Sequence, residues 1–213
     1  MLNKIYFNSS VPLPEDLTIN NIYDALISTQ DFFKTIRTNT SIILSSIIQS
    51  NNFSGVVSNV FTEKLNEVSC YKSYSDQRYP DLMHESKNIG LEVKASNKPW
   101  KGGEGHNGHS GWHIVVCYRI EENGDIEFIH VEIANLIGFE CSNSDWKYQG
   151  SSRNSNDSQR TETYITTDVG TAKLRDGSVY LNPHYVDLTI HRQKAREKVS
   201  SLAIPAFSPF YNN

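Results

Sequence analysis

The sequence predicts an α/β domain with a mixed central β-sheet flanked by helices, extending as one unit over residues 1–213. Apolar residues recur at helical spacing between residues 20 and 68, whereas alternating or continuous apolar runs dominate residues 79–134. A length of 213 residues allows one substantial hydrophobic core but not two generous ones. We therefore expect a helical N-terminal part, a sheet core over residues 79–134, and a further region over residues 142–181.

Composition and charge narrow the class of protein. A hydrophobic content of 38% argues against disorder, and the longest apolar runs are too short for a membrane span. The N-terminus lacks the apolar segment of a secretory signal, so we expect a cytoplasmic protein with no membrane partner. A net charge of −4 means that any nucleic-acid partner needs a local basic surface. The three cysteines form no CxxC pair and favour reduced thiols.

The N-terminal part predicts three helices after an irregular lead-in over residues 1–20. The first extends from Asn20 to about Arg37, where apolar residues keep helical spacing. The second continues through Ile48, and its isoleucines favour burial in the core over a subunit contact. The polar residues Asn51–Ser54 predict a break before a third helix, which ends near Val68.

Residues 79–96, with the sequence YPDLMHESKNIGLEVKAS, predict a β-hairpin that carries charged groups on one face. Apolar and polar residues alternate from Ile89 to Lys94, which is the pattern of a strand with one buried face. Glu92 and Lys94 therefore share the face opposite the buried one.

The polar residues Glu85–Asn88 predict the turn of this hairpin. If the turn is centred between Ser86 and Lys87, His84 faces Ile89 and Asp81 faces Glu92 on the antiparallel partner strand. Like charges that face each other destabilise a sheet unless something neutralises them. Oxygen ligands suit Mg²⁺, so a magnesium ion between the two acids is the predicted solution.

Pro80-Asp81 followed by Glu92-Val93-Lys94 resembles the PD-(D/E)xK superfamily of nucleases, and the whole chain resembles a small type II restriction endonuclease. The resemblance implies a restriction-endonuclease-like core. It also implies that Asp81, Glu92 and the carbonyl of Val93 hold the metal and that Lys94 is the catalytic lysine. Many relatives have another acidic residue on a preceding helix, for which Glu63 or Glu67 is available.

The resulting expectation is Mg²⁺-dependent, sequence-specific hydrolysis of double-stranded DNA by a homodimer, since two-fold symmetric sites suit two-fold dimers. The metal would act as a Lewis acid while Lys94 orients the attacking water. Three alternatives stay open: a repair nuclease or junction resolvase of the same fold, a non-catalytic DNA-binding module, and a zinc hydrolase.

The zinc alternative comes from a glycine-rich loop over residues 98–111. His106, His109 and His113 are spaced so that one metal ion can contact all three. Glycine-rich flanks hold ligands poorly, and the loop offers no cysteine to complete a structural site. The other interpretation is a loop in which His109 and Lys101 approach DNA.

The remaining sheet elements follow the hairpin. Apolar runs predict strands at Trp112–Ile120 and Ile126–Ala134, joined by a turn, and strands at Thr161–Thr167 and Ser178–Leu181. A brief turn of helix is predicted through Ile137.

The polar stretch 142–159 predicts either a DNA-binding loop or an exposed linker. Arginine pairs with guanine, and asparagine and glutamine pair with adenine, in the major groove. The candidates for such contacts are Arg153, Asn154, Asn156, Gln159 and Arg160. Lys147 suits a phosphate, Lys173 adds positive charge further along, and the basic tail fits either the DNA backbone or a solvated helix face.

Overall fold

The computed structural model describes residues 2–74, 79–100, 108–150 and 163–211, with one 3-10 helix, five α-helices and eight strands in this part of the chain. In chain order the elements are η1 Lys4–Tyr6, α1 Ile19–Thr40, α2 Leu44–Ile47, α3 Ser50–Val68, β1 Tyr71–Ser73, β2 Leu82–His84, β3 Gly90–Ser96, β4 Gly111–Ile120, β5 Ile126–Leu136, β6 Trp146–Gly150, β7 Thr163–Thr166, α4 Asp168–Asp176, β8 Ser178–Leu181 and α5 Ile190–Glu197.

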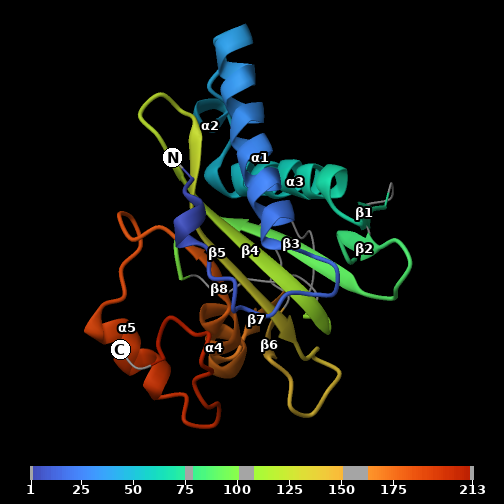
Figure 1. The fold of residues 1–213 in the computed structure, drawn as a ribbon, viewed down its shortest axis with the longest axis vertical. Coiled ribbons are helices and arrows are strands. Elements are labelled where there is room, and N and C mark those ends of the chain that lie inside the picture. Colours follow the sequence, from blue (N-terminus) through green and yellow to red (C-terminus); the bar gives the residue numbers. More distant parts are fainter. Residues whose placement is uncertain (1, 75–78, 101–107, 151–162, 212–213) are drawn as a thin grey trace.

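The centre of the fold is a six-stranded sheet in the order β1-β2-β3-β4-β5-β8 (Figure 1). β3 and β4 are parallel, and the other neighbouring strands are antiparallel. β6 and β7 form a separate two-stranded ribbon. The predicted mixed α/β architecture, with helices flanking a mixed sheet, is therefore confirmed.

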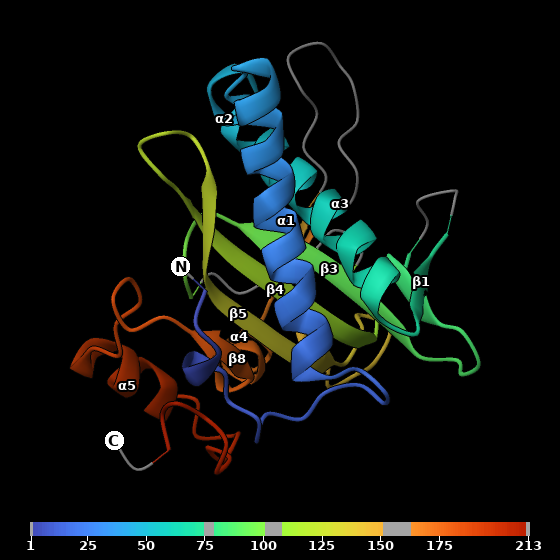
Figure 2. The same cartoon turned by 45° about the horizontal axis from the view of Figure 1, so that its top comes forward.

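Two long helices cover one face of the sheet, as Figures 1 and 2 show for α1 and α3. Ile22 and Leu26 of α1 and Phe61 and Leu65 of α3 are fully buried against the sheet. Thr18 and Asn21 form a capping box at the start of α1, each side chain accepting a hydrogen bond from the backbone N–H of the other. Local chemistry thus starts the helix, and burial of its apolar stripe holds it on the sheet.

The opposite face of the sheet packs against α4. Val115, Leu136, Trp146 and Leu174 form a separate apolar cluster there. Because side chains alternate along β3, the face that carries Glu92 is this one, away from α1 and α3.

The first helical region differs from the prediction in two ways. The break predicted at Asn51–Ser54 is wrong, because α3 begins at Ser50 and Phe53 in its first turn is only 1% exposed. The ring of Phe53 packs against Phe33, and this tertiary contact outweighs the weak helix propensity of the polar residues.

The predicted second helix is reduced to the four residues of α2, which lie against the turn between β4 and β5. Its expected burial holds only in part: Leu44 and Ile48 pack against the main core, whereas Ile42, Ile43 and Ile47 are 45%, 36% and 69% exposed. Ile43 lies against the turn between β4 and β5, where a Cβ added at Gly124 would be 2.3 Å from its Cγ2, so this contact covers it only in part.

The second half also differs from the prediction. β5 continues to Leu136, so the predicted turn of helix through Ile137 is wrong, and the Ile137 N–H donates to Asp145 Oδ2. Residues 146–150, expected within a loop, form β6, in which Trp146 is buried and the next three residues are exposed. The sequence did not predict α4, whose N-cap Thr167 accepts a hydrogen bond from Gly170 N–H.

The cysteines and the apolar segments behave as predicted. Cys70, Cys117 and Cys141 are all free thiols, and Cys117 is buried in the core. None of the helices in the described ranges combines the length and apolar character needed to cross a membrane.

Candidate functional site

The hairpin of β2 and β3 has the register that the sequence predicts. Leu82 pairs with Leu91 and Met83 with Gly90, and the His84 N–H donates to the Ile89 carbonyl at 2.9 Å. Continuing this register by one residue brings Asp81 opposite Glu92. The two acids of the predicted site therefore meet.

Asp81 lies just before β2 and takes part in the sheet through its side chain. The Asp81 Oδ2 atom accepts a hydrogen bond from the Val93 N–H at 2.8 Å, in place of a ladder bond from a partner strand. The preceding residue, Pro80, has no N–H to donate, and its ring packs against Gly90, where an added Cβ would lie 2.5 Å from the proline Cγ. These contacts fix the Asp81 carboxylate beside β3.

The charge of this acidic pair is only partly neutralised. Glu92 is 8% exposed, and its Oε1 atom accepts a hydrogen bond from Lys94 Nζ. Its other oxygen, Oε2, is buried and has no hydrogen-bond partner among the described residues. Burial raises the pKa of Asp81, and the charge of Glu92 raises it further, while Lys94 and the Val93 N–H oppose the shift. The described site therefore pairs two carboxylates with one ammonium.

The structure places Val93 beside the pair and Glu63 away from it. The Val93 carbonyl accepts a hydrogen bond from Ser58 Oγ of α3 at 3.1 Å, and a carbonyl oxygen has a second lone pair for another partner. Glu63 is exposed and lies about 140° around the helix from Ser58, since each residue turns an α-helix by about 100°. Glu67 is also exposed and pairs with Lys64 at 2.6 Å. α3 thus supports the site through Ser58 without bringing either acid to it.

Two further residues border the pair. The sequence analysis named His113 only as a possible zinc ligand and did not name Tyr79, so it placed neither of them beside the acids. His113 on β4 is the lateral neighbour of Glu92, and its Nδ1–H donates to the Gly111 carbonyl at 2.9 Å. Burial lowers the pKa of His113 to about 4, and the Lys94 charge contributes to this shift. The Tyr79 hydroxyl donates to the Ser110 carbonyl at 2.7 Å, and burial raises the pKa of Tyr79, with a further contribution from Glu92.

The sequence contained only part of the information needed to place Tyr79 and His113 beside the acidic pair. Tyr79 directly precedes Pro80 and Asp81, so its proximity to the site could have been inferred from the hairpin alone. The position of His113 depends on the parallel pairing of β3 with β4, which no local pattern specifies.

The three-histidine zinc site falls partly outside the described residues, because His106 lies there. Within the described residues, the ligand atoms of Asp16, Cys70 and His84 lie within 4.8 Å of one another, which is compatible with a metal. However, His84 Nδ1 accepts the Ser86 N–H, so His84 Nε2 carries the proton and donates to Asp16. Lys87 forms an ion pair with the same carboxylate. These contacts satisfy the cluster without a metal.

The predicted DNA-contacting residues divide into two groups. Those outside the described residues are Lys101, Arg153, Asn154, Asn156, Gln159 and Arg160. Of the others, Lys147 is exposed on β6, and the ring of His109 packs on Tyr79 with centroids 4.3 Å apart. Lys173 forms a 2.6 Å ion pair with the buried Asp145, so its charge links α4 to the start of β6.

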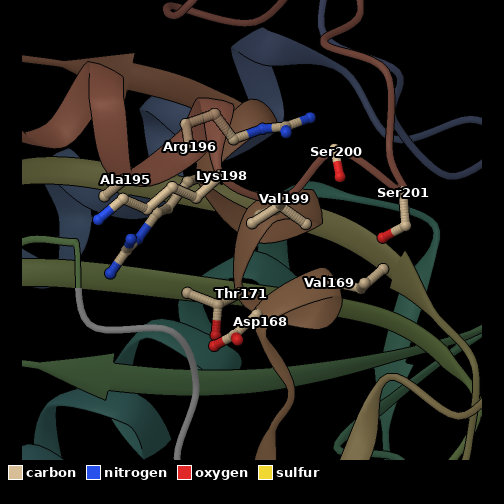
Figure 3. A pocket seen from close by; sticks show the side chains of 11 residues that line it. Asp168, Val169, Thr171, Ala195, Arg196, Lys198, Val199, Ser200 and Ser201 are labelled. Atoms are coloured by element: carbon tan, nitrogen blue, oxygen red, sulfur yellow. The ribbon is translucent and has the colours of Figure 1, made fainter.

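A separate pocket of about 640 Å³ lies between α4 and the end of α5 (Figure 3). Asp168, Thr171 and Lys198 are among the residues that line it. Arg196 also lines it, but its guanidinium is paired with Asp176. Asp81, Glu92 and Lys94 do not line this pocket. The candidate site and the pocket are therefore distinct places in the fold.

Comparison of the chain with protein-family models, with curated proteins and with solved structures finds no match. Function is therefore argued from the residues and their geometry.

Proposed function

We propose that this protein is a Mg²⁺-dependent, sequence-specific endonuclease of double-stranded DNA, with the restriction-endonuclease-like core of the PD-(D/E)xK superfamily. One observation carries the proposal. Asp81, which directly precedes β2, lies opposite Glu92 of β3. Among the described residues, Lys94 is the cation beside this pair and the buried Glu92 Oε2 has no hydrogen-bond partner. A buried acidic oxygen with no partner is costly unless a ligand satisfies it.

The residues present fit a magnesium ion. Two carboxylates and the Val93 carbonyl offer oxygen atoms, and Mg²⁺ takes oxygen ligands, usually one or two carboxylates with water and phosphate oxygens. The candidate ligands are Asp81, Glu92 and the carbonyl of Val93. A bound Mg²⁺ would supply Lewis acidity at the scissile phosphate.

Each of the surrounding side chains would then have its own role in the reaction. Asp81 stays oriented by the Val93 N–H, which holds its carboxylate toward Glu92. The Lys94 side chain is 27% exposed, so its ammonium can reach both Glu92 and a phosphate, orient the attacking water and stabilise developing negative charge. His113, held by Gly111, supports the same face without carrying charge at neutral pH.

The substrate and assembly are parts of the same proposal. A site-specific enzyme that cuts both strands suits a homodimer with one site on each strand, and we propose that it acts in the cytoplasm. Lys147, a predicted phosphate contact, lies within the residues that the structure describes and is exposed on β6.

The test is cleavage of unmethylated phage DNA and plasmid DNA with Mg²⁺, with and without a chelator. Asp81→Asn, Glu92→Gln and Lys94→Ala should each lower the rate on the order of a thousandfold while DNA binding persists. Matched controls come from α3, where Glu63 is exposed and Lys64 is half-buried and paired with Glu67: Glu63→Gln and Lys64→Ala should cut at the wild-type rate.

Three results would count against the proposal. Absence of Mg²⁺-dependent cleavage in the wild type, with DNA binding intact, would favour the non-catalytic module. Normal turnover in Lys94→Ala would remove that residue from the mechanism. Activity that requires stoichiometric zinc and is lost in His109→Ala would favour the zinc hydrolase.

A further inference from the structure

Five aromatic rings form a continuous series from the candidate site to the β6–β7 ribbon. In spatial order, this aromatic row consists of Tyr79, His109, Phe139, Tyr164 and Tyr148. Neighbouring ring centroids lie 4.3, 6.0, 4.6 and 5.4 Å apart along the row. Such distances are those of interacting aromatic pairs.

The row begins at the acidic pair and ends in a ribbon that is anchored next to it. Tyr79 is two residues before Asp81, and the charges of Glu92 and Asp81 both act on its hydroxyl. At the base of the ribbon, Trp146 packs on His113 with ring centroids 5.2 Å apart, and His113 is the lateral neighbour of Glu92. The row and the candidate site are thus parts of one surface.

The far end of the row is held in place and open to solvent. Tyr148 and Tyr164 are cross-strand partners in the ribbon. The backbone of Gly108 supports Tyr164 so closely that an added Cβ would lie 2.9 Å from the ring. Even so, Phe139 is 44% and Tyr148 53% exposed. Phe139 stacks on Tyr164 with ring planes 25° apart, and its remaining exposure together with that of Tyr148 leaves aromatic surface on which a further ring can stack.

We propose that Phe139 and Tyr148 stack against an unpaired base of the substrate strand while a phosphate of the same strand lies at Asp81 and Glu92. This inference rests on the proposed nuclease function and adds the state of the DNA that the site accepts. In a duplex both faces of each base are covered by its neighbours, so only a base that leaves the stack offers a face to these rings. Stacking of this kind tolerates any base.

A testable consequence concerns the energy of opening the duplex. Taking a base out of the stack has a cost, which is lowest for a mismatched or already unpaired base. A duplex that carries an unpaired base beside the cut site should therefore bind more tightly than the same duplex fully paired. The preference should depend on the exposed rings.

The experiment uses the full chain with Ca²⁺ in place of Mg²⁺, and duplexes that carry the cut site mapped from digested plasmid. One set is fully paired, and the other places a single unpaired base at successive positions from the cut. Tyr148→Leu and Phe139→Leu should each reduce binding of the unpaired-base duplex about tenfold and bring it level with the paired duplex. Tyr148→Phe keeps the ring and should retain the preference.

Tyr211→Leu is the matched control, because Tyr211 is 46% exposed and lies at the far end of the chain from the row in sequence. It should bind both duplexes like the wild type. If the wild type shows no preference, or both leucine variants keep it, the stacking inference is wrong while Mg²⁺-dependent cleavage still supports the nuclease. If the wild type neither binds nor cuts DNA, the proposed function itself fails.

Discussion

Asp176 and the Asp81–Glu92 pair are both buried acids, but their surroundings differ. Asp176 accepts hydrogen bonds from Arg196 at 2.9 and 2.8 Å and from Ser208 Oγ at 2.7 Å, so both of its oxygens are satisfied. For Asp81 and Glu92, Lys94 is the neighbouring cation among the residues that the structure describes. Within those residues Glu92 Oε2 has no hydrogen-bond partner.

The difference separates an acid whose charge is fully compensated within the fold from acids whose charge the described residues compensate only in part. Asp176 joins the end of α4 to α5 and to the C-terminal segment, and its charge is fully compensated by a guanidinium. The acidic pair joins only β2 and β3, which the strand ladder already connects. Its incomplete neutralisation therefore supports a role in binding a cation more than a role in stability.

The largest expected effect on the free energy of unfolding comes from breaking the buried ion pair between Asp176 and Arg196. Asp176→Asn should lower the free energy of unfolding by about 3–5 kcal/mol, because it leaves the buried charge of Arg196 without a counter-charge, with only backbone carbonyls and a neutral amide as acceptors. Urea unfolding at neutral pH measures the change. As a control, Glu67→Gln removes the exposed ion pair with Lys64 and should cost at most about 1 kcal/mol. Equal losses in the two variants would contradict the comparison.

A divalent cation should stabilise the wild type through the acidic pair. At a free Ca²⁺ concentration about a hundred times the dissociation constant, the unfolding free energy should rise by about 2.7 kcal/mol. Glu92→Gln should remove this gain. Asp16→Asn should keep it, because the Asp16 cluster is already satisfied by His84 and Lys87. Thermal unfolding with and without Ca²⁺ measures both, and a gain lost in Asp16→Asn would move the cation site to that cluster.

Glu132 is a third kind of buried acid and predicts a pH dependence. It faces His130, Arg175 and Arg192, and burial raises its pKa to about 8 against the opposing arginine charges. The folded protein therefore binds more protons than the unfolded chain between the ordinary pKa of 4.5 and about 8. Stability from this group is present at low pH and falls as pH rises through that window, by up to about 1.4 kcal/mol per pH unit.

Glu132→Gln should abolish this contribution to the pH dependence of the free energy of unfolding. The measurement is urea unfolding of the variant and the wild type at several pH values across the window. His130, whose pKa is lowered to about 3 by burial, acts in both proteins, so its contribution cancels in the difference. Parallel pH profiles for the two proteins would show that Glu132 is not the titrating group.

The smallest expected effect on the free energy of unfolding is that of Asp81→Asn, measured in the presence of a chelator. The substituted amide oxygen can still accept the Val93 N–H, and the change removes a negative charge facing Glu92. We expect unfolding free energy equal to or above that of the wild type at neutral pH, since the raised pKa of Asp81 marks its charged form as unfavourable there. A loss approaching that of Asp176→Asn would show that Asp81 is structural.

The acidic pair was predictable because its geometry is local. A polar turn and a run of alternating residues set the antiparallel register, and Leu82 pairs with Leu91 as that register requires. The sequence also predicted α1, β4 and β5 to within a few residues, since apolar periodicity is strong there. α4 and β6 were missed because each buries few apolar side chains: two of the four buried residues of α4 are Gly170 and Asp176, and Trp146 is the one buried residue of β6.

By itself, the sequence determined the hairpin register, the shared face of Glu92 and Lys94, and the mixed α/β class, because turn chemistry and side-chain alternation act over neighbouring residues. Only the tertiary structure decided that His113 lies beside Glu92, that Lys173 is committed to Asp145 and that Glu63 faces away. These outcomes depend on a parallel strand pairing and on how helices pack against the sheet. Such contacts join distant parts of the chain, and the burial that stabilises them leaves no local pattern.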